Sequence, residues 1–197
     1  KIKYDFDRIV SHMRQQAYLV KGLKISLFDL RESGEKVKDT EVFYIKELEI
    51  EAPSMTFYFD GGLISLIRFY NQTLKPLHKN IFYVEKQNDN FESVEVALQY
   101  VDDIASRVLP FANNIYNVEG GTHITGFKAA LTRTLNNYAK KNNIIKENDD
   151  SFTGEDVLEG LTAVISIKLR EIQFEGQTKG KLGSVEARGL VETVFSD

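Results

Sequence analysis

The 197-residue sequence contains no cysteine and no apolar run close to the roughly 20 residues that a membrane-spanning helix needs. The missing cysteines exclude a disulfide framework and any metal site built on thiolates. The first residues, Lys1–Asp5, also lack the apolar stretch of a signal peptide. The composition therefore predicts a soluble cytosolic protein with one large domain or two small ones, and no membrane partner.

Histidine is scarce, and its spacing is not that of a metal site. His12, His78 and His123 lie far apart, so we expect no bound metal ion. For His123 we predict a local hydrogen bond that orders the turn Gly120–Thr122, and no catalytic role. The formal net charge of −4 offers no overall attraction to nucleic acid. Any DNA contact therefore needs a local basic surface.

The first 60 residues predict one helix followed by two strands. Apolar residues recur at helical spacing from Phe6 to Val20. Two β-rich stretches, Lys24–Leu30 and Glu41–Ile50, predict antiparallel strands around a polar loop.

A domain boundary is expected near Gly61, which separates residues 1–60 from residues 61–197. Beyond it, the hydrophobic pattern alternates between helix and strand spacing. The predicted elements are a helix over 63–74, strands over 80–86, 93–101 and 108–112, a helix over 123–141, a short helix opened by the capping pattern Thr153–Asp156, a strand over 161–168, and a helix capped by Ser184 that runs to Phe195. The core stripe of the long helix is predicted to contain Phe127, Ala130, Leu131, Thr134 and Tyr138. This order indicates a mixed α and β structure in two parts.

One glycine-spaced segment, Gly176–Gly183, has the composition of a phosphate-contacting loop. Its glycines free the backbone, while Lys179 and Lys181 carry mobile ammonium groups. Gln177 and Lys179 offer donors suited to a terminal phosphate. Composition alone favours a solvated surface loop. A second candidate anion site, Glu119–Thr122, lacks the spacing of a P-loop.

Five blocks of sequence occur in a characteristic order and spacing. They are Phe111–Ile115, Glu119–His123, Gly126–Arg133, Glu159–Ser166 and Gln173–Leu182. Together they resemble the transducer domain of the ATPase subunits of type IIA topoisomerases, over about Phe57 to the C-terminus. The preceding segment is similar to the last helix and strand of a GHKL-type ATPase domain.

This resemblance implies an α+β fold. It would be a two-layer sheet-and-helix transducer like the second domain of ribosomal protein S5, preceded by the C-terminal remainder of a GHKL ATPase domain. It also implies a left-handed βαβ crossover, against the general rule. Gln177 and Lys179 would reach the ATP of the neighbouring ATPase domain, where Lys179, the one catalytic candidate, contacts the γ-phosphate. A contact that hydrolysis removes can switch the angle between two domains.

The resemblance further implies cofactors and partners. ATP and Mg²⁺ serve the full-length protein, whereas this segment alone is expected to bind neither, because the family's magnesium ligand, catalytic glutamate and ATP lid belong to sequence upstream of Lys1. It is therefore expected neither to hydrolyse ATP nor to supercoil DNA alone. The implied partners are DNA, the DNA-cleaving gyrase A protein, and a second copy of the ATPase chain in the ATP-bound state. The implied location is the cytoplasm, at the nucleoid.

For DNA contact, the resemblance points to Lys128 and Arg133 on the long helix. Five residues span about 140° around a helix, so both cannot face one duplex directly, and Lys128 is the better candidate. Topoisomerase IV shares these blocks, although the overall similarity favours the gyrase branch. An S5-like interaction module without nucleotide coupling is the alternative from a different class. The intact Gln177 and Lys179 speak against that alternative.

Overall fold

The computed structural model describes residues 3–32, 51–89, 92–146 and 149–196. The chain divides into two compact units, Lys1–Gly62 and Leu63–Asp197. The assignment of these units to an ATPase remainder and a transducer stays a prediction at this point.

The first unit consists of helix α1 (Phe6–Leu19) and the antiparallel strands β1 (Lys24–Phe28) and β2 (Ser54–Tyr58). Asp5 caps the helix by accepting a hydrogen bond from the Arg8 amide at 3.1 Å. The predicted helix and the first predicted strand are therefore confirmed.

Strand β2 was not predicted from the sequence. The strand predicted over 41–50 lies outside the described residues, and β2 supplies the partner of β1 in the described part. The segment that follows β2 packs on α1, where the ring of Phe59 stacks on Tyr18 with centroids 3.6 Å apart. Phe57–Gly62 combines aromatic residues with glycines. This pattern indicated a domain boundary more strongly than a strand.

The second unit is built around a five-stranded sheet with strand order β3-β4-β8-β5-β6. The strands are β3 (Phe82–Gln87), β4 (Ser93–Tyr100), β5 (Arg107–Ala112), β6 (Ile115–Tyr116) and β8 (Leu161–Lys168). The central strand, β8, pairs antiparallel with β4 and parallel with β5. It is buried from Leu161 to Ile167, as its mostly apolar composition predicted.

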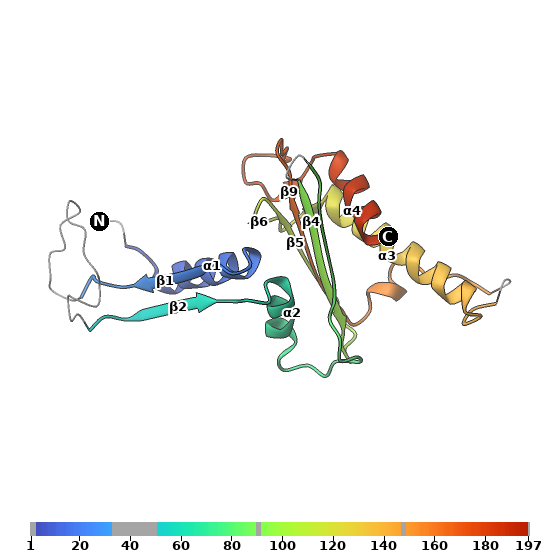
Figure 1. Cartoon of the computed structure of the whole chain (residues 1–197), viewed down its shortest axis with the longest axis horizontal. Helices are drawn as coiled ribbons and strands as arrows, with labels where there is room; N and C mark the ends of the chain where they lie inside the picture. Colours follow the sequence, from blue (N-terminus) through green and yellow to red (C-terminus); the bar gives the residue numbers. More distant parts are fainter. Residues whose placement is uncertain (1–2, 33–50, 90–91, 147–148, 197) are drawn as a thin grey trace. The chain divides into compact units, whose positions relative to one another are not determined.

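Helices α3 (Thr122–Lys141) and α4 (Glu186–Ser196) pack against one face of this sheet (Figure 1). The core between these two layers contains apolar residues from alternate strand positions and from both helices. Among them are Val96, Leu98, Ala163, Ile165, Phe127, Leu131 and Val191. Because β5 and β8 are parallel neighbours joined through α3, the chain makes a βαβ crossover, whose hand stays a prediction.

Helix α2 (Leu63–Asn71) covers the opposite face. Asn71 Nδ2 donates to Gln99 Oε1 at 3.0 Å, and Thr162 Oγ1 donates to Asn71 Oδ1 at 2.8 Å. Gln99 and Thr162 alternate along their strands with core residues that face α3 and α4, so this polar triad lies on the other side of the sheet. The predicted α+β fold class, with a sheet and helices packed in layers, is confirmed.

Two details of the predicted helices are wrong. Helix α2 ends at Asn71, three residues before the predicted end. In α3, Tyr138 is 60% exposed and Ala139 is buried instead, because the C-terminal half of the helix extends past the sheet (Figure 1).

The capping pattern before β8 is confirmed, with a shorter helix than expected. The Thr153 amide donates to Asp156 Oδ2 at 2.6 Å, and the Asp156 amide donates to Thr153 Oγ1 at 3.2 Å. The helix that follows is the single 3₁₀ turn Asp156–Leu158. None of the described helices combines the length and apolar character that crossing a bilayer requires.

Candidate functional site

The glycine-spaced segment forms a hairpin-like projection between β8 and α4, which we call the 173–183 loop. Its two arms pair through an antiparallel bridge between Phe174 and Leu182. The Glu175 amide donates to the Lys181 carbonyl at 2.9 Å, and the two side chains form an ion pair at 2.9 Å. The arms are therefore ordered by backbone pairing, and Lys181 is held within the loop.

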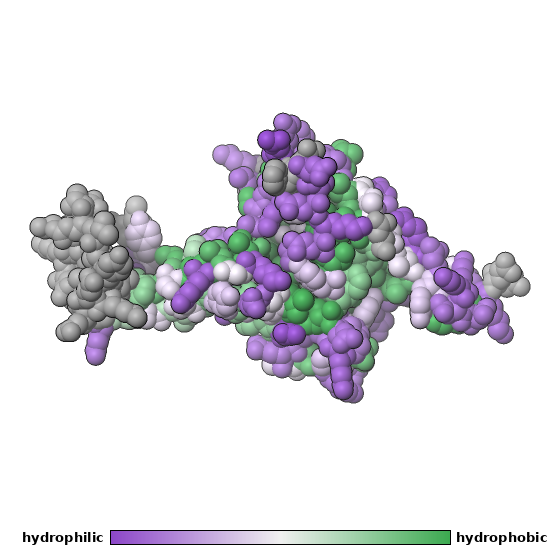
Figure 2. Space-filling model, viewed as in Figure 1, coloured by the Kyte–Doolittle hydropathy of each residue, from purple (hydrophilic) through white to green (hydrophobic). Residues whose placement is uncertain are grey.

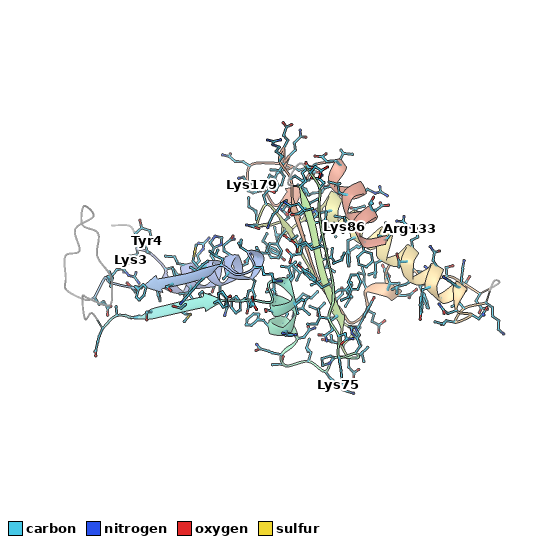
Figure 3. The ribbon with its side chains drawn as sticks, in the orientation of Figure 1. Lys3, Tyr4, Lys75, Lys86, Arg133 and Lys179 are labelled. Atoms are coloured by element: carbon cyan, nitrogen blue, oxygen red, sulfur yellow. The ribbon has the colours of Figure 1, made fainter. Side chains whose placement is uncertain are left out.

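Gln177, Thr178 and Lys179 form the exposed tip of this loop. The turn is closed by the Lys179 amide, which donates to the Gly176 carbonyl at 3.3 Å, and both residues have positive φ, +91° at Gly176 and +56° at Lys179. The tip lies at one end of the sheet, where Figure 2 shows a hydrophilic surface and Figure 3 shows Lys179 far from Lys75. An amide and an ammonium group are thus offered to solvent together.

The Lys179 ammonium group has an aromatic neighbour in place of a carboxylate. Its Nζ lies 5.9 Å from the centroid of the Phe174 ring, within the range of a cation–π contact. Within the described ranges, Lys179 makes no ion pair. Because a surface cation–π contact is weak, the ammonium group can leave it for a stronger acceptor such as a phosphate oxygen.

The base of the loop is fastened to the segment that precedes α3. Strand β9 (Lys181–Leu182) pairs parallel with β7 (Gly120–Gly121). Asn117 Nδ2 donates to the Lys179 carbonyl at 2.8 Å, and the Glu119 amide donates to the Gly180 carbonyl at 2.9 Å. Backbone pairing and two hydrogen bonds therefore join the loop to the segment that leads into α3.

Gly121 makes this close pairing sterically feasible. Its φ is +140°, and a Cβ added there would lie 2.5 Å from the carbonyl oxygen of Leu182. The candidate anion cradle Glu119–Thr122 is not formed as such, because the Glu119 and Gly120 amides donate to protein carbonyls.

Ser184 plays a different part from the predicted helix cap. Its Oγ accepts a hydrogen bond from the Gln173 amide at 2.9 Å, and its carbonyl accepts from Thr122 Oγ1 at 2.6 Å. Ser184 thus links Gln173, at the start of the loop, to Thr122, at the start of α3. Sequence spacing alone could not show this, since Thr122 lies 62 residues away.

The local hydrogen bond predicted for His123 is not formed. The side chain is fully buried, and neither ring nitrogen has a hydrogen-bond partner among the described residues. Burial lowers the pKa of His123 to about 4, so the ring is neutral at pH 7. The preceding turn is ordered instead by the Gly120 amide, which donates to the Asn117 carbonyl at 2.8 Å.

The structure separates the two DNA candidates on α3. Lys128 is exposed and lines a pocket of about 370 Å³ together with Glu119, Glu175 and Lys181, at the base of the loop. Lys128 has no side-chain partner in the part of the chain that the structure describes.

Arg133 is held by α4. Its guanidinium donates to Glu192 at 3.3 Å and to Ser196 at 3.1 Å. Hydrogen bonds from Arg188, and secondarily from Arg133, hold the pKa of the Glu192 carboxyl below its usual range. Figure 3 shows Arg133 on α3 well away from Lys179. Only Lys128 of this pair is brought near the 173–183 loop.

Sequence reasoning missed Asn117 and Phe174 as neighbours of Lys179. Phe174 could have been found from the hairpin pairing, whereas nothing local to Asn117 indicates its partner 62 residues later. Among residues 3–32, 51–89, 92–146 and 149–196, no group of three His, Cys, Asp or Glu side chains is placed to hold a metal ion.

Comparison with known proteins gives consistent matches. A family model described as DNA gyrase B matches residues 62–197. The chain is 44% identical over 195 residues to the DNA gyrase B protein of Clostridium acetobutylicum, covering 99% of this chain and 28% of that protein. It is also 44% identical to the DNA gyrase B protein of Bacillus mycoides, covering 99% of this chain and 44% of that protein.

Solved structures extend the likeness to three dimensions. The 43K ATPase domain of Thermus thermophilus gyrase B, in complex with an aminocoumarin, matches all of this chain with a TM-score of 0.80, 33% identity and 47% coverage of that structure. A topoisomerase IV ATP-binding domain from Francisella tularensis shares the fold with a TM-score of 0.74 and 23% identity over 100% of this chain and 47% of that chain. The chain thus spans less than half the length of each of these relatives.

Proposed function

Because the chain belongs to the DNA gyrase B family, we propose that it couples ATP binding and hydrolysis to DNA strand passage and negative supercoiling. In this proposal, the first unit is the end of a GHKL ATPase domain and the second unit is the transducer. The 173–183 loop reports the state of the nucleotide to the transducer.

The observation that supports this role most strongly is the unpaired ammonium group at the loop tip. Lys179 and Gln177 project donors into solvent, while the neighbouring Lys181 is neutralised by Glu175. The tip therefore offers one mobile cation and one amide to an external anion. This donor set suits the terminal phosphate of ATP, on which negative charge is concentrated.

The proposed mechanism relies on a contact that differs between two states. Lys179 donates to a γ-phosphate oxygen of ATP in the neighbouring ATPase domain, and the Gln177 amide gives a second hydrogen bond. When hydrolysis detaches that phosphoryl group, the loop loses the partner that held it. A ligand shifts a conformational equilibrium only by such differential binding. The resulting change in the position of the loop is transmitted to α3 through the β7–β9 pairing and the contacts of Asn117 and Glu119.

The full-length protein supplies the remaining chemistry. ATP and Mg²⁺ are the proposed cofactors, with Gln177 and Lys179 as this chain's contribution to the ATP site and no residue assigned to the metal. The proposed partners are DNA, the DNA-cleaving gyrase A protein and a second ATPase chain in the ATP-bound state. These partners imply a location in the cytoplasm, at the nucleoid.

Substitution of Lys179 by alanine in the complete ATPase chain tests this function. Removal of an electrostatic contact to a reacting group lowers kcat by on the order of 100-fold. We therefore expect steady-state ATP hydrolysis to fall by about this factor in Lys179→Ala. The matched control is Lys181→Ala, which removes a cation two residues away that is already paired, and should change kcat less than about 3-fold.

Equal effects of the two substitutions would contradict the proposal and favour a non-enzymatic S5-like module. This segment alone should show no ATP turnover, because most of the ATPase domain is not part of it. Topoisomerase IV is the alternative within the class. Negative supercoiling of relaxed DNA by the complete enzyme separates the two, since decatenation without supercoiling would indicate topoisomerase IV.

For DNA, we propose Lys128 as the contacting residue, because it is exposed and unpaired whereas Arg133 is bound to α4. Lys128→Ala should lower DNA-stimulated ATP hydrolysis several-fold while basal hydrolysis stays unchanged, and raising the salt concentration should diminish the difference. Arg133→Ala is the control and should leave the stimulation intact. Equal loss of basal and stimulated activity in Lys128→Ala would argue against a DNA role.

A further inference from the structure

The side chain of Asn117 connects a buried position at the end of the sheet to the exposed loop tip. Asn117 is fully buried, and its backbone amide donates to the Pro110 carbonyl at 3.0 Å. Its carbonyl accepts from the Gly120 amide at 2.8 Å. With its backbone fixed at both ends, the residue presents Nδ2 to the Lys179 carbonyl at 2.8 Å.

Lys179 needs such an external contact because of its backbone conformation. Its φ of +56° lies in the left-handed region, which residues with a Cβ adopt only at a cost. Within the loop, the closing bond from the Lys179 amide to Gly176 is 3.3 Å long, whereas the Asn117 bond is 2.8 Å. The shorter bond comes from outside the loop. It restrains the peptide that follows Lys179 and so the direction of its Cα–Cβ bond.

Stability alone gives little reason for an asparagine at position 117. Its Oδ1 is buried with no hydrogen-bond partner among the described residues, so only the donor end of the amide is satisfied. A half-satisfied buried amide stabilises a fold less than a fully paired one. What asparagine contributes is a neutral N–H donor aimed at one carbonyl, which an aspartate carboxylate cannot replace.

We propose that Asn117 is a positioning residue that holds Lys179 in the conformation from which its ammonium group reaches the terminal phosphate. The proposal rests on the proposed function of Lys179. Asn117 acts through the backbone of Lys179 and does not touch the nucleotide. Without the Asn117 side chain, the Lys179 ammonium group is still present but points toward the phosphate less often. Misplacement of a reacting contact by about 1 Å can lower the rate by up to about 100-fold.

The test uses the complete ATPase chain with Asn117→Ala and Asn117→Asp. The second variant keeps the shape of the side chain, so it separates the lost donor from a folding defect. Both variants are expected to lower kcat for ATP about 10-fold, with KM changed less than about 2-fold. In a Lys179→Ala background, Asn117→Ala should have an effect of less than about 2-fold, since the group it positions is gone.

Asn113→Ala provides the matched control. The Asn113 side chain also bonds a distant backbone, donating to the Leu169 carbonyl at 3.0 Å and accepting from the Leu169 amide at 2.9 Å, but it does not contact the loop tip. Its substitution should affect thermal stability and leave kcat of the folded enzyme unchanged. Any small effect on kcat should be the same with and without Lys179.

The outcomes distinguish the two proposals. If Lys179→Ala lowers kcat but the Asn117 variants do not, or if their effect multiplies that of Lys179→Ala, the positioning role is wrong while the proposed function stands. If Lys179→Ala itself leaves ATP hydrolysis unchanged, the proposed function fails and the role of Asn117 fails with it. A loss of kcat that is absent in the Lys179→Ala background supports both.

Discussion

Substitution of Gly121 by alanine tests whether the fastening of the 173–183 loop to α3 contributes to stability. Gly121 has a φ of +140° and a ψ of −166°, a region that is essentially restricted to glycine. An alanine in that conformation costs about 2 kcal/mol. The new Cβ would lie 2.5 Å from the oxygen and 2.6 Å from the nitrogen of Leu182, so β9 must also move away.

The total cost follows from adding the lost strand pairing to the backbone strain. Loss of the backbone pairing at the two paired positions of β7 and β9, at about 1 kcal/mol each, brings the expected destabilisation to about 4 kcal/mol. Gly176 is the matched control. It also has positive φ, at +91°, but no atom lies within 4 Å of an added Cβ. Gly176→Ala should therefore cost only the strain, about 1–2 kcal/mol.

Urea unfolding followed by far-UV circular dichroism measures both differences on this chain. Amide hydrogen exchange at residues 120–122 and 181–182 locates the change, which should accelerate in Gly121→Ala and stay the same in Gly176→Ala. If the two variants lose the same free energy of unfolding, the β7–β9 pairing contributes nothing measurable. The steric argument for a glycine at 121 would then be refuted.

Two further predictions concern buried polar groups of the second unit. Because burial lowers the pKa of His123 from 6.5 to about 4, the unfolded chain binds a proton more readily, and stability should fall as the pH drops from about 6.5 to 4. The loss should reach about 3 kcal/mol in urea titrations, and His123→Asn should flatten the profile. Asn71→Ala leaves the buried side chains of Gln99 and Thr162 without their partner and should lower the free energy of unfolding by about 3 kcal/mol. Replacement of both Asn71 and Thr162 by apolar residues should recover part of that loss, and no recovery would contradict the hydrogen-bond explanation.

The sequence predicted well those elements whose pattern is long and locally determined. The bounds of β8 agree with the prediction, because the mostly apolar, β-rich segment 161–168 has the length and composition of a buried strand. Helix α3 differs from its predicted span by one residue at the start. Strands β7 and β9 could not be predicted, because these two-residue strands exist only through pairing with each other over a long separation in sequence.

In the candidate site, too, features that depend on a short segment could be predicted, whereas contacts between distant segments could not. The loop, with Gln177 and Lys179 at its tip, was recognised from its glycines and cations together with the family resemblance. The neutral, unpaired state of His123 and the contact from Asn117 to Lys179 depend on how distant segments pack. No pattern within a short window carries that information. The exposure of Tyr138 likewise depends on where the sheet ends beneath α3.

The central position of β8 has a consequence for how the chain acquires its structure during synthesis. The strand that completes the sheet is the last of the five to leave the ribosome, and until then β4 and β5 have no neighbour in common. A nascent chain that stops before Leu161 exposes two strand edges, which favours association with other chains. Contacts between β8 and its neighbours join residues about 55 to 75 positions apart, and closure over such separations slows folding. A translational pause before this strand has left the ribosome should therefore increase aggregation, whereas a pause after it has emerged should not.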